Sequence, residues 1–88
     1  MSKFVLDLSG RKVYLGKYKH YKNQYYEVIN ICTHTETGEE FVYYKSELDG
    51  KFWIRPVKMF FENIEINDLA SENFSKIKPR FEFVPENQ

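Results

Sequence analysis

Turn-forming residues recur at short intervals along this chain, and only short regular elements fit between them. Glycine and asparagine dominate these positions because they tolerate a positive φ at little cost. The turns fall at Ser9-Gly10, Lys22-Asn23-Gln24, Thr37-Gly38, Asp49-Gly50 and Asn67-Asp68. The runs between them are apolar or alternate between apolar and polar residues. This spacing predicts a mainly β fold, with a small antiparallel barrel or sandwich as its architecture.

The clearest strand is residues 25–33 (YYEVINICT), which is rich in β-branched and aromatic residues. The loop THTETGEE follows, in which Gly38 can take a positive φ, and residues 41–45 (FVYYK) form the returning strand. Further strands are expected at residues 17–22, 51–56 and 64–66, with edge strands at 3–8 and 80–84 that pair with each other.

Helical structure is expected only in short pieces. Residues 57–62 (VKMFFE) are too few for a stable helix and predict a single 3₁₀ turn. Asn67 or Asp68 can cap a short helix over residues 69–75, which Pro79 ends.

The 88 residues form one domain, residues 1–88, close to the lower size limit for a fold without staples. Aromatic residues make up 18% of the chain and supply the buried area that so small a core needs. Core positions are predicted at Tyr18, Tyr26, Val28 and Phe41. Four further tyrosines cannot all be inside as well, so some must be exposed: Tyr21, Tyr25, Tyr43 and Tyr44.

A single cysteine, Cys32, excludes an internal disulfide and a cysteine-based zinc site within one chain. The run that contains it, YYEVINIC, has the composition of a buried strand, which favours a reducing compartment. The N-terminal apolar stretch is short and is interrupted by Asp7. It fits neither a signal peptide nor a membrane span, and we expect a cytoplasmic protein that does not enter a membrane.

The charges are balanced overall but unevenly placed. Residues 1–35 carry six basic and two acidic residues, and residues 36–88 carry seven basic and eleven acidic ones. A basic end beside an acidic end can steer an anionic partner, whereas the zero net charge makes nucleic acid the second choice.

Three spaced motifs carry a family resemblance: GKYKHYKNQYYEV, THTETGEEFVYY and FWIRPVKMFFENIEI. Together they resemble the bacterial family known as domain of unknown function 1653. Its members share a G-x-Y-x-H-Y-K-G-x-x-Y-x-V opening, an R-H-S-E-T-G-E-E hairpin and a W-V-R-P-x-x-M-F segment. The resemblance implies a small SH3-like β-barrel over residues 16–66, with residues 67–88 as an extension, and it implies no agreed biochemical activity.

The chain departs from the family pattern at several positions. Asn23 stands where the family has glycine, and asparagine also tolerates a left-handed φ. Thr33 replaces the usual arginine, which removes any anion contact that the arginine carries. The closing motif KPRFEF follows an inserted NDLASENFSKI.

His20 and His34 are the two histidines of the chain. They can serve as acid–base groups because imidazole titrates near neutrality, or bind a metal together with Glu36 or Glu39. Neither spacing is tight, and polar side chains in such hairpins usually bond the loop backbone. Structural hydrogen bonding is therefore the favoured role for both, followed by contact with a ligand.

The segment from Trp53 to Phe60 is the most informative group. In SH3-like folds, the strand before the short helical turn flanks the usual peptide groove. Trp53 can stack on an aromatic or proline ligand while Arg55 holds a carboxylate or phosphate. Alternatively, Trp53 and Phe60 cap the barrel, and Arg55 pairs with Glu62 or Glu47.

The sequence contains no nucleophile elbow, phosphate-binding glycine loop or close carboxylate pair, so we expect no catalytic residues, cofactor or metal site. The leading hypothesis is a non-catalytic binding module for a protein segment or an anionic ligand. Its predicted site is His20, Tyr21, Lys22, His34, Trp53 and Arg55. The alternatives are single-stranded nucleic-acid or nucleotide binding, a small enzyme that uses a histidine, and a protein that is a monomer or a dimer through the 80–84 edge strand.

Overall fold

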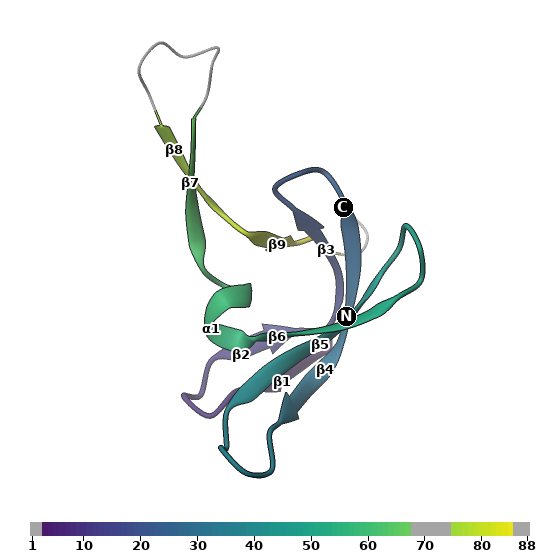
Figure 1. The fold of residues 1–88 in the computed structure, drawn as a ribbon, viewed down its shortest axis with the longest axis vertical. Coiled ribbons are helices and arrows are strands. Elements are labelled where there is room, and N and C mark those ends of the chain that lie inside the picture. The colour runs from purple at the N-terminus through teal and green to yellow at the C-terminus, as the bar shows by residue number, and fades with distance from the viewer. Residues whose placement is uncertain (1–2, 68–74, 86–88) are drawn as a thin grey trace.

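The computed structural model describes residues 3–67 and 75–85 and consists mainly of strands (Figure 1). The strands are β1 (Phe4–Leu6), β2 (Lys12–Tyr14), β3 (Gly16–His20), β4 (Tyr25–Thr33), β5 (Glu40–Ser46), β6 (Phe52–Pro56), β7 (Asn63–Asn67), β8 (Ser75–Pro79) and β9 (Phe81–Phe83). A short helix, α1, spans Val57–Phe60. The prediction of a mainly β, antiparallel fold is therefore confirmed.

The strands form one five-stranded sheet in the order β6-β5-β4-β3-β9 and two hairpins, β1-β2 and β7-β8. All of these pairings are antiparallel. In the described part of the chain, β6 and β9 lie at opposite ends of the large sheet and do not pair with each other, so the strand pairing does not close into a barrel. The β7-β8 hairpin projects away from the sheet (Figure 1).

The first strand does not pair with residues 80–84 as predicted. β1 pairs with β2, with Val5 opposite Val13, while β9 pairs with β3. The Asp7 carboxylate explains the difference, because it accepts hydrogen bonds from the backbone N–H groups of Ser9 (3.0 Å) and Arg11 (2.7 Å). Such a tight local turn closes a short loop at a lower entropic cost than pairing with the far end of the chain.

The helical turn after β6 is α-helical rather than 3₁₀. The N–H of Phe61 donates to the carbonyl oxygen of Val57 at 3.2 Å, which is an i to i−4 bond. Pro56 precedes the helix, where its missing N–H removes no helical hydrogen bond. Of the helix predicted over residues 69–75, residues 69–74 lie outside the described residues, and Ser75 begins β8.

A β-bulge in β4 changes which side chains face the core. Val28 lies opposite Tyr44, but Asn30 lies opposite Tyr43, so one extra residue is inserted between them. The inward positions before the bulge are even-numbered, and after it Ile31 lies opposite the buried Val42. The prediction that Cys32 is buried is wrong for this reason: the bulge places it opposite Phe41, where it is exposed.

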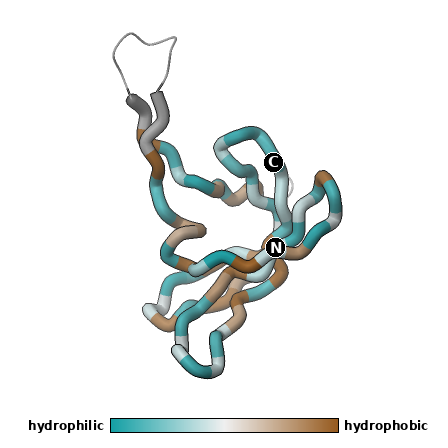
Figure 2. Tube along the Cα trace, in the orientation of Figure 1, coloured by the Kyte–Doolittle hydropathy of each residue, from teal (hydrophilic) through white to brown (hydrophobic). Residues whose placement is uncertain are grey.

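Aromatic rings dominate the core on the inner face of the five-stranded sheet. The buried cluster is Tyr18, Val28, Val42, Tyr44, Phe60 and Phe81. The rings of Phe60 and Phe81 stack with centroids 4.1 Å apart and planes 4° apart. Tyr18 and Val28 are buried as predicted, whereas Tyr26 and Phe41 are half-buried. Hydrophilic residues dominate the β3–β4 and β4–β5 loops (Figure 2).

Of the four tyrosines that could not all be inside, Tyr44 is buried at 5% exposure. Tyr25 is exposed at 39%, and the other two are half-buried. The prediction that some of these rings face outward is confirmed for Tyr25.

The stacked Phe60–Phe81 pair is expected to carry much of the stability of the fold. Phe60→Ala should lower the free energy of unfolding by about 3–5 kcal/mol, because the side chain is fully buried and leaves a cavity. The control is Phe52→Ala at a side chain that is 55% exposed, where the loss should be about 1 kcal/mol or less. Denaturant titration measures both, and equal losses would contradict this account of the core.

Candidate functional site

A hollow of about 310 Å³ opens on the inner face of the sheet, beside the core. We call it the ring-lined hollow. Its lining residues are Gln24, Tyr26, Tyr44, Ser46, Leu48, Asp49, Trp53 and Arg55. They come from β4, β5 and β6 and from the turns at either end of these strands.

Strand register explains why these side chains meet. Trp53 lies opposite Tyr44, and Tyr26 lies opposite Ser46. Residues that lie opposite each other in an antiparallel pair share a face, and alternate residues along a strand point the same way. Arg55 therefore follows Trp53 on the inner face, next to the buried ring of Tyr44.

Among the described residues that line this hollow, Arg55 is the one cation. Its Nε donates to the hydroxyl oxygen of Tyr44 at 3.4 Å, and its guanidinium carbon lies 5.9 Å from the centre of the Phe81 ring. Among the described residues, no carboxylate forms an ion pair with it. The expected pairing with Glu62 or Glu47 is not found, because Glu62 pairs with Arg80 at 2.8 Å and Glu47 approaches Lys17 at 3.9 Å.

The tyrosines of the hollow hold their rings in fixed positions. Tyr26 and Tyr44 pack edge to face with centroids 5.5 Å apart. Burial raises the pKa of the Tyr26 hydroxyl, so it stays protonated and donates to the Oε1 of Gln24 at 3.0 Å. The Trp53 side chain, by contrast, is 49% exposed and has one side open to solvent. The hollow thus combines ordered rings with one accessible indole.

His20 ends β3 and is followed by Tyr21 and Lys22, and none of the three is among the residues that line the hollow. The His20 ring lies 4.8 Å from Phe81 and 4.5 Å from Tyr21, measured between ring centres. The Lys22 ammonium lies 5.7 Å from the centre of the Tyr21 ring. His20 and Arg55 therefore contact the same Phe81 ring, which joins the two halves of the predicted site.

His34 lies apart from this group, in the β4–β5 hairpin. Its Nδ1 accepts hydrogen bonds from the backbone N–H groups of Glu36 (3.1 Å) and Thr37 (3.3 Å). These are the loop-stabilising bonds expected of a polar side chain in such a hairpin. Of the six predicted site residues, Trp53 and Arg55 line the hollow and His20 contacts the Phe81 ring beside it, whereas His34 lies elsewhere.

Sequence reasoning missed several residues that line the hollow or lie beside it. Tyr44 could have been found by placing Trp53 opposite it across the Asp49-Gly50 turn, because hairpin pairing fixes which residues face each other. Asp49 is part of that same turn. No local sequence pattern marks Phe81. It lies beside the hollow because β9 pairs with β3, and these two strands are far apart in the sequence.

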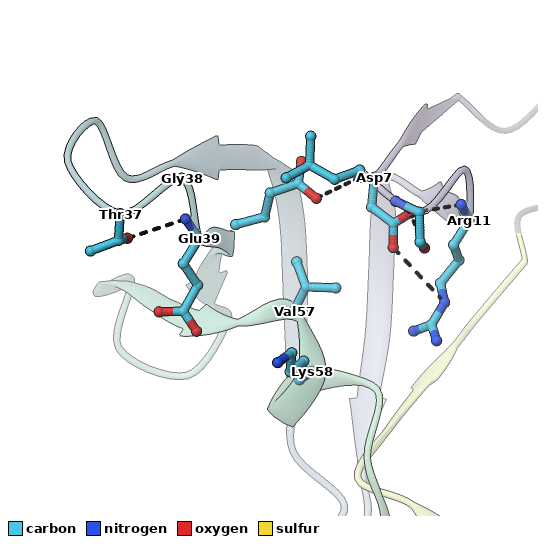
Figure 3. Close-up of a pocket in the computed structure, with 10 residues that line it drawn as sticks. Asp7, Arg11, Thr37, Gly38, Glu39, Val57 and Lys58 are labelled. Carbon is cyan, nitrogen blue, oxygen red and sulfur yellow. Dashed lines mark hydrogen bonds and ion pairs between the residues drawn. The ribbon is translucent and has the colours of Figure 1, made fainter.

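A second hollow, of about 450 Å³, lies between the β1–β2 turn, the β4–β5 hairpin and the start of α1 (Figure 3). Three of its charged groups, Asp7, Arg11 and Glu40, are engaged with each other or with the backbone. Glu40 accepts the N–H of Leu8 at 2.7 Å, and Asp7 lies 4.0 Å from the Arg11 guanidinium. In the part of the chain that the structure describes, none of its lining residues is aromatic. The smaller ring-lined hollow is therefore the better candidate for recognition.

Other site types find little support in the part of the chain that the structure describes. There, no group of three or more His, Cys, Asp and Glu side chains could hold a metal ion. Within the same residues, no helix has the length and apolarity to cross a membrane.

Fold and site together define a small, open antiparallel β domain with an arginine among aromatic rings on its inner face. The chain belongs to the family described as "Protein of unknown function (DUF1653)", which matches residues 16–83. The match continues through β9, past the boundary expected at residue 66.

A crystal structure of a protein of this family from Bordetella bronchiseptica is similar to this chain, with a TM-score of 0.61 and 23% identity. The similarity covers 80% of this chain and 85% of the other. Among curated proteins, none matches this chain.

His20 is expected to titrate below the ordinary histidine value of 6.5. Burial lowers its pKa first, and the positive charges of Arg80, Lys22 and Arg55 lower it further. The unfolded chain then binds a proton that the folded chain does not, so stability falls as the pH drops below about 6.5. NMR titration of the imidazole checks the prediction. Arg55→Gln should raise this pKa, and a parent value at or above 6.5 would contradict the account.

Proposed function

We propose that this protein is a non-catalytic binding module that recognises an acidic protein segment through the ring-lined hollow. The observation that carries this proposal is the position of Arg55, a half-buried guanidinium held by Tyr44 and without a carboxylate partner among the described residues. A guanidinium in such a setting is suited to bind a carboxylate, because charge-assisted hydrogen bonds are stronger than neutral ones.

The exposed indole of Trp53 supplies the apolar part of the same site. Trp and Tyr beside Arg is the composition of the energetic centres of protein interfaces. A proline or aliphatic side chain of the partner can stack on Trp53 while a neighbouring carboxylate reaches Arg55. The SH3-like arrangement implied by the family resemblance also puts the ligand beside the strand that leads into the helical turn, which here is β6.

Asp49 narrows the choice of ligand. Its carboxylate lines the same hollow and accepts the N–H of Lys51 at 3.0 Å. This bond is the largest cause that lowers the pKa of Asp49, so the group is ionised at neutral pH. A fixed negative charge opposes a second anion in the hollow, which favours a segment with one well-placed carboxylate over a polyphosphate chain.

The placement of the lysines points the same way. Lys17 and Lys19 alternate with the buried Tyr18, so they lie on the outer face of the sheet. Lys17 is also near Glu47 at 3.9 Å and lies 4.7 Å from the centre of the Tyr25 ring. Neither lysine lines the hollow. These lysines therefore add no positive charge to the hollow, where a bound nucleic-acid strand would need several cations for its phosphates.

The test uses the tetrapeptide Ac-Pro-Val-Glu-Pro-NH₂, with Trp53 fluorescence as the readout. Arg55→Gln should weaken its binding by about tenfold or more, because a hydrogen bond to a charged group contributes about 1.5–3 kcal/mol. Lys19→Gln is the matched control on the outer face and should change the dissociation constant by about twofold at most.

The same peptide with Gln in place of Glu should bind as weakly to the parent as the original does to Arg55→Gln. Equal binding of the two peptides would overturn the proposal. Binding of oligonucleotides that weakens steeply with salt, with no response to either peptide, would favour nucleic-acid recognition instead.

Asp49→Asn offers a second test with the opposite sign. Removing this negative charge should tighten binding of the Glu peptide by roughly two- to threefold, since an exposed charge pair contributes little. The Gln peptide should show no such gain. A weaker affinity for the Glu peptide would mean that Asp49 contacts a donor of the ligand and that the charge argument is wrong.

A further inference from the structure

Three consecutive residues of β6 are exposed, although all three are large and apolar. Phe52 is 55% exposed, Trp53 49% and Ile54 61%. Successive side chains of a strand point to opposite faces, so both faces of β6 are open at this point. β6 is at the end of the five-stranded sheet, and within residues 3–67 and 75–85 no strand pairs with the side of β6 that faces away from β5.

The hydrogen-bond pattern shows which backbone groups β6 presents at this edge. The N–H of Ser46 donates to the carbonyl oxygen of Lys51 at 2.9 Å, so Lys51 is directed toward β5. Antiparallel pairs alternate between bonded and non-bonded positions. The backbone groups of Trp53 and Arg55 therefore bond to β5. The N–H and C=O groups of Phe52 and Ile54 point away from β5, toward the open edge of the sheet.

Pro56 fits this pattern. It follows Phe52 and Ile54 at the same spacing, so an N–H at this position would point outward as well. The N–H that Pro56 lacks would not have bonded to β5, so the proline removes no bond within the sheet. The open edge therefore offers two residues, each with one donor and one acceptor, before proline ends it.

Charge defines what can pair there. Residues 51–61 (KFWIRPVKMFF) contain three basic residues, Lys51, Arg55 and Lys58, and no acidic one. A second copy of the chain would suit this edge poorly. The antiparallel register in which both copies use Phe52 and Ile54 sets Lys51 of each against Arg55 of the other, and like charges in opposite positions are destabilising.

The two faces of β6 differ in a way that defines the pattern of the partner. On the outer face, the Phe52 ring stacks on Tyr43 with centroids 5.6 Å apart, and Ile54 extends this apolar surface. On the inner face, Arg55 lies in the ring-lined hollow. A strand laid along β6 would place apolar side chains beside Phe52 and Ile54 and acidic ones beside Arg55.

We infer that the open edge of β6 takes up an extended segment of a partner protein as an additional antiparallel strand, with apolar and acidic residues alternating along it. This inference rests on the proposed function and specifies how the acidic segment binds: main-chain hydrogen bonds supply affinity, and side-chain alternation supplies specificity.

The experiment titrates the full chain with Ac-Val-Glu-Val-Glu-Val-Glu-NH₂ and follows amide hydrogen exchange by NMR. Exchange at Phe52 and Ile54 should slow by about tenfold or more at saturation, because their amides become bonded. Ile54→Pro removes one outward N–H but no bond to β5, and it should weaken binding by about tenfold. Ile54→Val keeps the N–H and should stay within about twofold of the parent.

Modified peptides give the same test without changing the protein. In antiparallel pairing, the residues opposite Phe52 and Ile54 share their face, so the valines of the probe make the bonds to β6. N-methylation of the valines should abolish binding, whereas N-methylation of the glutamates, whose N–H groups point away, should leave it intact.

The outcomes separate this inference from the proposed function. If both N-methylated peptides bind equally and exchange at Phe52 and Ile54 is unchanged, strand addition is wrong, while recognition of the Pro-containing Glu peptide through Arg55 still stands. If Arg55→Gln also leaves the affinity for the Pro-containing Glu peptide unchanged, both proposals fail. Sedimentation that shows a dimer with the same two amides protected in the absence of any probe would overturn the choice of partner.

Discussion

The stacking of Phe60 on Phe81 is the contact on which the rest of this small fold depends. It joins α1 to β9, which is a strand of the five-stranded sheet. The rings of Tyr18 and Tyr44 pack edge to face against this pair. A domain of this size buries a smaller share of its surface than a larger one does, so each large ring in its core matters. The ring cluster covers the inner face over β5 and leaves the part over β6, at Trp53, open.

The candidate site lies on the part of the inner face that the ring cluster does not cover, directly beside it. Core and site therefore share residues. Tyr44 is a buried core ring whose hydroxyl holds Arg55, and Phe81 contacts both Arg55 and His20. Side chains locked by packing hold a binding group in one position, which lowers the entropy lost on binding. The open sheet also has an edge, and within the described residues β6 pairs with β5 on one side only.

Local signals predicted the local features well. Asn23 and Gly38 have φ values of 66° and 74°, as their turns required, and the strands before and after Gly38 pair as a hairpin. Features set by distant contacts escaped prediction. The bulge that exposes Cys32 interrupts an otherwise regular alternation, and no periodic pattern reveals where an extra residue is inserted. Phe81 enters the core only because β9 pairs with β3. The grouping of Trp53 with Arg55 could be predicted because both belong to one strand.

The central claim is that an acidic segment binds where β6 meets the ring-lined hollow. The most direct measurement is an isotope-filtered NOE experiment on labelled protein with the unlabelled valine–glutamate peptide. The account predicts contacts from the valine side chains to Phe52 and Ile54 and from the glutamate side chains to the Trp53 indole. Contacts confined to the hollow beside Lys58, or to the lysines of the outer face, would contradict it.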